Sequence, residues 1–280
     1  MSARVPLALL LFFAGSSHAY VQTFSSLVRV RAHSRQVRGA LGLRAEVAKN
    51  GVASKIALVA LGCPKNTVDA EVMLGDLKKR GFDIVRRPRD ADVVIVNTCA
   101  FIEEAKTESV QAVLEAVDLK KSSAKGVVIT GCMAQRYAQE LADELPEVDA
   151  VVGFEKYADI GNQIESIITK SGFAMPEVAV GSTDVPFRPE WERVRITQQH
   201  AAFLRVAEGC DHKCTFCAIP SWRGRFRSKS FDAIMEEARE LVATGVTELN
   251  LIAEDTNQWG QDFGAADKRR LAALLHSLAG

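Results

Sequence analysis

The sequence has no excess of charge of either sign and no long hydrophobic segment near its start. Its 280 residues carry 35 basic and 35 acidic side chains, so no net positive charge marks it as a nucleic-acid-binding protein. The apolar stretch at residues 5–14 is too short to cross a bilayer as a helix. The first 45 residues lack Asp and Glu altogether, which leaves the remainder of the chain with a net charge of −6.

This acid-free N-terminus has the pattern of a targeting leader. Arg4 precedes the apolar stretch and Ser17 and Ala19 follow it, as in a signal peptide, while residues 20–45 are rich in Arg and Ser, as in a transit peptide. Secretion conflicts with the cysteines described below, because an oxidising compartment would pair thiols that must stay reduced. We therefore expect residues 1–50 to be a disordered bipartite leader to a plastid, with the mitochondrion or the cytoplasm as alternatives.

Residues 54–170 alternate strand patterns with helix patterns. Continuous apolar runs predict buried parallel strands at 56–61, 93–96, 127–129 and 150–152. Amphipathic spacing predicts helices at 69–80, 103–119, 134–145 and 160–168. The pattern indicates an open α/β domain with a parallel sheet.

A second and shorter α/β series follows a predicted linker. Residues 171–196 contain several prolines and no strong periodicity, so they are expected to connect two domains. Residues 197–280 then predict strands at 202–206 and 248–252 and helices at 231–244 and 271–278. A (βα) barrel needs six to eight such units. The sequence therefore predicts the start of a barrel domain that is incomplete, so that the chain is expected to be truncated.

Three cysteines lie in one short loop directly after the first strand of this second series. Cys210, Cys214 and Cys217 have the spacing C-x3-C-x2-C, and the loop contains no fourth cysteine. A four-iron cluster takes four thiolates, so three would leave one iron with an open coordination position. Structural zinc is disfavoured because its sites are usually two C-x2-C pairs, and His212 is too close in sequence to complete one easily. Disulfides within so tight a knot would have poor geometry.

The other three cysteines share a different context, because each follows a predicted strand of the first domain. Cys63, Cys99 and Cys132 stand after the strands at 56–61, 93–96 and 127–129. The carboxyl ends of neighbouring parallel strands lie along one edge of a sheet, so the three thiols are predicted to converge there. Buried cysteines are also common core filler, and this alternative stays open for the three taken alone.

Both cysteine sets resemble known signatures. The loop with Phe216 before its last cysteine resembles the signature of radical S-adenosylmethionine enzymes, and the resemblance implies that Phe216 lies close to the adenine of the cofactor. With both sets in view, residues 55–264 are similar to RimO-type methylthiotransferases. The most specific segments are Leu61-Gly62-Cys63-Pro64-Lys65-Asn66, Asn97-Thr98-Cys99-Ala100-Phe101-Ile102, Thr130-Gly131-Cys132-Met133-Ala134-Gln135-Arg136-Tyr137, Val148-Asp149-Ala150-Val151-Val152-Gly153 and Pro220-Ser221-Trp222-Arg223-Gly224-Arg225-Phe226-Arg227-Ser228.

This resemblance implies two 4Fe-4S clusters and S-adenosylmethionine as cofactors. Cys210, Cys214 and Cys217 match the ligands of the cluster that cleaves the cofactor, and the other three cysteines match those of an auxiliary cluster that holds or donates sulfur. The implied reaction adds a methylthio group to the β-carbon of an aspartate in small-subunit ribosomal protein twelve. Pro64 and Lys65 favour that branch over methylthiotransferases of tRNA adenosine, which remain an alternative, as does an inactive truncated Fe-S protein.

The same resemblance implies further partners and a few residues of interest. It implies an electron donor such as ferredoxin or flavodoxin, a monomeric protein and no membrane association in the mature form. Glu254 stands where the ribosomal-protein branch usually has Gln. Asp255, just past a strand end, is either an active-site residue or a turn residue. His212 is expected to shape its loop.

A basic run and two tryptophans complete the candidates. The run after the cysteine loop either binds the cofactor carboxylate or an acidic substrate surface, or is a solvated loop. Its members are Arg223, Arg225, Arg227 and Lys229. Trp222 and Trp259 are expected to pack in the interior rather than to contact a substrate.

Overall fold

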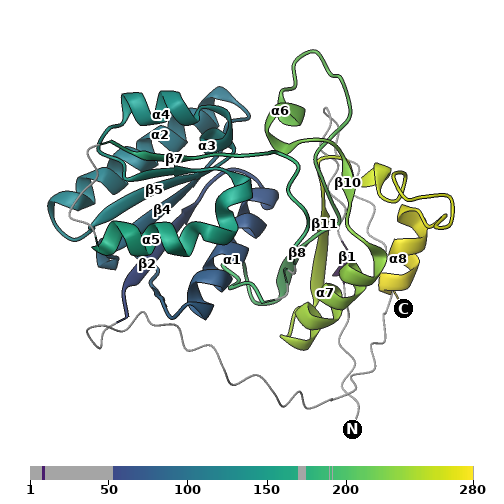
Figure 1. Ribbon diagram of the computed structural model, residues 1–280. Coiled ribbons are helices and arrows are strands. Elements are labelled where there is room, and N and C mark those ends of the chain that lie inside the picture. Colours follow the sequence, from purple (N-terminus) through teal and green to yellow (C-terminus); the bar gives the residue numbers. More distant parts are fainter. Residues whose placement is uncertain (1–7, 10–52, 170–174, 189, 191, 280) are drawn as a thin grey trace, which may run out of the picture.

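The computed structural model describes residues 8–9, 53–169, 175–188, 190 and 192–279. The expected leader at residues 1–50 therefore lies outside the described residues, apart from the two-residue strand β1 (Ala8–Leu9). The described chain forms two α/β units, each built on its own parallel sheet (Figure 1).

The first unit is a six-stranded sheet in which every strand runs parallel to its neighbours. Its order is β3-β2-β4-β5-β6-β7. The strands are β2 (Lys55–Ala60), β3 (Asp83–Ile84), β4 (Val93–Thr98), β5 (Gly126–Gly131), β6 (Ala150–Val152) and β7 (Glu177–Ala179). All residues of β4 and β5 are buried, as expected of central strands covered on both faces. The open parallel sheet predicted from the apolar runs is confirmed.

Helices cover both faces of this sheet (Figure 1). One face carries α1 (Pro64–Lys79) and α5 (Ile160–Thr169). The other carries α2 (Glu103–Asp118), α3 (Cys132–Arg136) and α4 (Ala138–Glu144). Short 3-10 turns join these elements: η1 (Pro88–Asp90), η2 (Leu119–Lys121) and η3 (Phe154–Asp159).

Three expectations for this unit differ from the structure. The helix predicted at 69–80 begins earlier, at Pro64, because proline is well suited to a first helical position, where no N–H is needed. The helix predicted at 134–145 is interrupted at Tyr137, whose φ of −126° and ψ of 37° leave the helical region. The linker predicted at 171–196 contains β7, which pairs with β6 and extends the first sheet.

The second unit is smaller. Its sheet has the order β1-β11-β8, all parallel, with β8 (Ala201–Arg205) and β11 (Glu248–Ile252) as predicted. The helices are α6 (Ile219–Arg223), α7 (Phe231–Ala243) and α8 (Leu271–Ala279), with the 3-10 turn η4 (Thr256–Gln258). An antiparallel pair, β9 (Ala207–Glu208) and β10 (Arg227–Ser228), brackets the cysteine loop and α6.

The two units share a packed interface to which α1 and α6 both contribute. Val68 and Val72 of α1 contact Phe203 of β8 and Ile252 of β11 in one small apolar cluster. In addition, Trp222 of α6 is 2% exposed and belongs to the hydrophobic core of the first unit, although it follows the cysteine loop of the second. The interface therefore ties the second cysteine loop to the first sheet.

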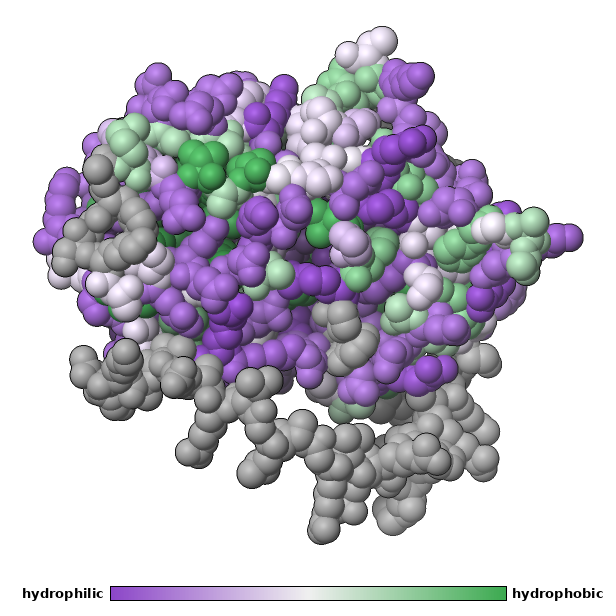
Figure 2. Space-filling view, viewed as in Figure 1, coloured by the Kyte–Doolittle hydropathy of each residue, from purple (hydrophilic) through white to green (hydrophobic). Residues whose placement is uncertain are grey.

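Among the described residues, no helix is long and apolar enough to span a membrane. Hydrophilic side chains cover most of the face seen in Figure 2, and hydrophobic ones gather over the first unit in the region of β7.

Candidate functional site

The three cysteines of the first unit lie at the carboxyl ends of neighbouring strands. Cys63 follows β2 and stands at the position just before α1, Cys99 follows β4, and Cys132 is the first residue of α3 after β5. Since β2, β4 and β5 are adjacent in the sheet, the predicted common edge is confirmed. Cys99 and Cys132 are buried and Cys63 is half-buried, so Cys63 is the most exposed of the three.

Close backbone approach brings these strand ends together. Gly62 has a φ of +86°, and a Cβ there would stand 2.7 Å from the Cβ of Cys99 and 3.0 Å from its Sγ. Gly131 has a φ of +92°, and a Cβ there would stand 2.3 Å from the carbonyl oxygen of Thr98. Only glycine fits both positions. These two glycines allow the loops that carry Cys63, Cys99 and Cys132 to meet.

Asn66 of α1 links the three strand ends by hydrogen bonds. Its side-chain amide donates to the carbonyl oxygens of Leu61, at 3.2 Å, and Thr98, at 2.7 Å. The thiol of Cys132 lies 3.6 Å from its Oδ1. Asn66 is fully buried, so these hydrogen bonds satisfy groups that water cannot reach.

Burial raises the pKa of the Cys132 thiol to about 12, although the nearby guanidinium of Arg223 opposes this shift. Cys63 is close enough for its charge to raise the same pKa. Binding of iron at this site therefore requires loss of the Cys132 proton.

The donor set of this site consists of cysteine thiols from three adjacent strand ends. Among the described residues, no three His, Cys, Asp or Glu side chains are placed to hold one ion together. Thiolates are the usual ligands of iron–sulfur clusters. Three thiols at adjacent strand ends, which approach closely at Gly62 and Gly131, fit the auxiliary cluster that the resemblance implies.

The cysteines of the second unit lie in the loop between β9 and α6, which extends beyond the body of the molecule (Figure 1). The backbone N–H of Cys217 donates to the carbonyl oxygen of Cys214 at 3.1 Å, and that of Cys210 donates to the carbonyl oxygen of Gly224 at 3.2 Å. Cys214 is exposed, whereas Cys210 and Cys217 are half-buried. The loop presents three thiols on one short turn, and these fit the same kind of cluster.

Phe216 is 85% exposed, so it contacts little of the described protein. An exposed ring beside the thiols is compatible with an apolar contact to a bound cofactor. His212 contacts Asp255, with 2.8 Å between Nε2 and Oδ2. Asp255 also accepts a hydrogen bond from the backbone N–H of Asn257 and so caps η4. These contacts support the loop-shaping role expected for His212 and the turn role that was one of two alternatives for Asp255.

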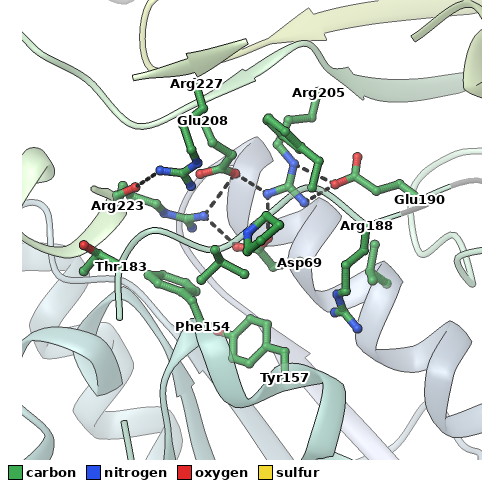
Figure 3. A pocket seen from close by; sticks show the side chains of 14 residues that line it. Asp69, Phe154, Tyr157, Thr183, Arg188, Glu190, Arg205, Glu208, Arg223 and Arg227 are labelled. Carbon is green, nitrogen blue, oxygen red and sulfur yellow. Dashed lines mark hydrogen bonds and ion pairs between the residues drawn. The ribbon is translucent and has the colours of Figure 1, made fainter. Parts of the chain in front are cut away.

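A buried network of ion pairs at the interface of the two units was missed at the level of sequence (Figure 3). Arg205 of β8 pairs with Asp69 of α1 at 2.7 Å, and also with Glu190 and Glu208. Arg223 pairs with the same Asp69 at 2.9 Å and with Glu208 at 3.4 Å. Burial alone would raise the pKa of Glu190, but Arg205 and Lys229 lower it to about 2. Glu190 is therefore held as a carboxylate in its ion pairs with Arg205 and Lys229.

The basic run divides into two parts. Arg223 and Lys229 are buried in ion pairs, and Lys229 lies 2.8 Å from Glu190. Arg225 is 85% exposed at its side chain, and Arg227 is half-buried. The solvated-loop alternative therefore holds for Arg225 and fails for Arg223 and Lys229. Trp222 and Trp259 are both buried, which confirms the expectation of packing.

Glu254 lies just after β11 with both carboxylate oxygens buried and without a hydrogen-bond partner among the described residues. Burial and the neighbouring charge of Glu208 raise its pKa to about 7, against the opposing charges of Arg223 and Lys65. The only sequence signal for this residue was its departure from the glutamine of the similar family.

Comparison with known proteins gives matches to both units. Residues 55–153 match the model of a family described as uncharacterized protein family UPF0004, and residues 204–272 match that of the radical SAM superfamily. A protein of Geotalea uraniireducens named ribosomal protein uS12 methylthiotransferase RimO is 44% identical over 231 residues, which cover 82% of this chain and 51% of that protein. A protein of the same name from Myxococcus xanthus is 44% identical over 222 residues, covering 79% and 45%.

This chain spans about half the length of the curated relatives that it matches. Among solved structures, the radical S-adenosylmethionine methyltransferase TsrM from Kitasatospora setae, with cobalamin and a [4Fe-4S] cluster bound, matches with a TM-score of 0.46 and 14% identity. That match covers 74% of this chain and 50% of the other.

Proposed function

We propose that this chain, which resembles RimO-type methylthiotransferases in both of its units, is a radical S-adenosylmethionine methylthiotransferase. Its substrate would be an aspartate of ribosomal protein uS12, which receives a methylthio group on its β-carbon. The relatives named uS12 methylthiotransferase and the radical SAM match support the activity. The two three-cysteine sets support a requirement for two 4Fe-4S clusters.

One observation carries the proposal, namely that two consecutive residues join the two cysteine sets. The guanidinium of Arg223 donates to the Sγ of Cys132 at 3.5 Å, and the carbonyl oxygen of Gly224 accepts from the N–H of Cys210 at 3.2 Å. Residues 223 and 224 therefore connect the two sets. Transfer of sulfur from one centre to a carbon activated at the other requires the two centres to be held in a defined arrangement.

The chain's own residues bind and orient the reacting groups. Cys210, Cys214 and Cys217 would hold the cluster that binds S-adenosylmethionine, with Phe216 against the adenine, and the cysteines of the first unit would hold the auxiliary cluster. When bound, these groups supply removal of a hydrogen atom from the unactivated substrate carbon and the sulfur and methyl that replace it. The electron that starts the reaction would come from a ferredoxin or flavodoxin, and the protein would act as a monomer.

The test uses reconstituted protein supplied with strong reductant and S-adenosylmethionine. We expect mass spectrometry to detect the methylthio mass on uS12 and no such mass on tRNA, and we expect 5′-deoxyadenosine to be released. Modified tRNA with unmodified uS12 would favour the tRNA-modifying alternative. No release of 5′-deoxyadenosine would indicate an inactive Fe-S protein or a cluster carrier.

Two matched triple variants assign the cysteine sets. Replacing Cys210, Cys214 and Cys217 by Ala should abolish release of 5′-deoxyadenosine, whereas replacing Cys63, Cys99 and Cys132 should retain release and abolish methylthiolation. Each variant should contain half the iron of the parent protein. Release of 5′-deoxyadenosine by the first variant would contradict the assignment.

We also propose a plastid location, supported by the Arg-rich and acid-free residues 1–45. A fusion of residues 1–50 to a fluorescent protein should accumulate in plastids. Accumulation in mitochondria or in the cytoplasm would contradict this location.

A further inference from the structure

Arg223 occupies an unusual position between the two cysteine sets. It is the last residue of α6, shortly after the cysteine loop of the second unit, yet its side chain is buried against the first unit. The neighbouring Trp222 is packed in the core of the first unit, so the backbone that carries the guanidinium is fixed there. The backbone of Arg223 therefore belongs to the second unit, while its guanidinium lies among residues of the first.

The two terminal nitrogens of its guanidinium contact different acceptors. Nη2 donates to Oδ1 of Asn66 at 2.8 Å and to Sγ of Cys132 at 3.5 Å. Nη1 pairs with Asp69 and Glu208. The carbon between these nitrogens lies 4.3 Å from the centre of the Phe154 ring. The planar fork thus binds two carboxylates with one nitrogen and faces the thiol site with the other.

A donor at a cysteine sulfur has a defined effect on a metal cluster. Hydrogen bonds to ligating sulfurs and nearby positive charge stabilise the additional negative charge of a reduced cluster, and so they raise its reduction potential. Such partners of ligands also orient the ligands, and their loss typically weakens metal binding 10- to 100-fold. The guanidinium of Arg223 makes such a contact with the Cys132 sulfur of the first set.

We propose that Arg223 is a positioning residue for the auxiliary cluster, which it stabilises and holds at a higher reduction potential by donating to the sulfur of Cys132. This inference rests on the proposed function of the first cysteine set. Because Gly224 is hydrogen-bonded to Cys210, the same backbone segment also contacts the second set.

A purely structural role of Arg223 at the interface is the competing explanation, and Arg205 provides the matched control. Arg205 is also a buried guanidinium that pairs with Asp69 and Glu208. Its hydrogen bonds within the described residues go to carboxylates, not to a sulfur. A substitution of Arg205 therefore disturbs the same ion pairs without removing a donor from the thiol site.

The experiment begins with the full chain in which Cys210, Cys214 and Cys217 are replaced by Ala, so that only the first set can hold iron. Arg223→Lys and Arg205→Lys are then compared in this background. A lysine at 223 keeps the positive charge for Asp69 and Glu208 but lacks the second nitrogen that reaches Asn66 and Cys132. Arg223→Gln and Arg205→Gln form a second pair, in which residue 223 keeps an N–H donor and loses its charge.

The readouts are iron and sulfide content, the rate of iron loss to a chelator, and the midpoint potential from a redox titration followed by electron paramagnetic resonance. We expect both Arg223 variants to shift the potential in the negative direction and to hold iron about 10- to 100-fold more weakly. We expect both Arg205 variants to match the background. Circular dichroism checks that all four variants are folded.

The other possible outcomes of this experiment test the inference and the proposed cluster separately. Equal shifts in the Arg223 and Arg205 variants, or no shift in either, would overturn the inference and leave the proposed cluster intact. If the folded background protein binds no iron, the proposed auxiliary cluster fails, and the inference fails with it. If an Arg223 variant does not fold, the other substitution at the same position decides the question.

Discussion

The two cysteine sets differ in how much of the fold each one requires. The first set is assembled from three strand ends that are far apart in sequence, and two of its thiols are buried. The second set lies on one loop, and Cys214 is exposed there. Scattered ligands meet only after the sheet has formed, whereas a local set is assembled by a single turn. The first site is therefore built into the core, and the second depends on where its loop is anchored.

The largest expected effect on stability comes from removing the side chain that anchors the second cysteine loop to the first unit. Trp222→Ala removes a side chain that is 2% exposed and belongs to the first core. We expect a loss of about 4 kcal/mol in the free energy of unfolding, measured by urea denaturation. Trp259→Ala is the control, because Trp259 is buried in the core of the second unit. It should destabilise the protein to a similar degree while leaving the first site able to bind iron. A Trp222 variant of unchanged stability would contradict the anchoring.

The close approach of strand ends in the first site is tested by Gly131→Ala. A Cβ at this position would stand 2.3 Å from the Thr98 carbonyl oxygen and would also impose a positive φ on alanine. We expect a destabilisation of about 3 kcal/mol and loss of iron from the first site. Gly245→Ala in the second unit is the control, since its φ is +94° and nothing lies within 4 Å of the added atom. It should cost about 1 kcal/mol and leave iron content unchanged. Equal costs for the two variants would contradict the role given to close packing.

The position of the first cysteine set can be predicted from the sequence, whereas the ion pairs at the interface depend on tertiary contacts. Apolar runs predict the strands, and strand ends of a parallel sheet share an edge, so the meeting of Cys63, Cys99 and Cys132 could be predicted. The start of α1 at Pro64 was missed, although a proline after the strand was an available signal. The pairing of Arg223 with Asp69 joins distant segments of the chain, and no periodicity or motif indicates that two such residues meet.

The polar groups beside the two sites also differ, and Glu254→Gln tests this difference, because the charge of Glu254 acts on the Cys210 thiol of the second set. Asn66 in the first site is fully hydrogen-bonded, whereas the buried carboxylate of Glu254 has no partner among the described residues. Burial raises the pKa of Glu254 from 4.5 to about 7, so the folded protein favours the protonated form. The stability that the protonated carboxyl of Glu254 contributes is therefore fully present below about pH 4.5, and it is lost as the pH rises through about 7.

Glu254→Gln removes the titrating carboxyl, so the variant should not lose stability as the pH rises through about 7. We expect it to be more stable than the parent protein by on the order of 2 to 3 kcal/mol at pH 8 and nearly equal to it at pH 4.5. Urea denaturation at both pH values measures the difference. Asp255→Asn is the control, because the pKa of that carboxyl is lowered, against the effect of burial, by its hydrogen bonds to His212, Gln258 and Asn257. It should not gain stability at pH 8. A gain for Glu254→Gln that is independent of pH would show that burial of charge is not the cause.

The smallest expected effect concerns Phe216, which marks the exposure of the second site. Its ring is 85% exposed, so Phe216→Ala should change the free energy of unfolding by less than about 0.5 kcal/mol. An exposed aromatic ring that stabilises nothing in the protein itself can still bury apolar area against a ligand. We therefore expect the variant to bind S-adenosylmethionine more weakly in the reconstituted protein, measured by equilibrium dialysis, while Phe216→Tyr retains binding. If Phe216→Ala unfolds the protein as strongly as Trp222→Ala, the loop of the second site is packed as tightly as the first site, and the difference between the two sets disappears.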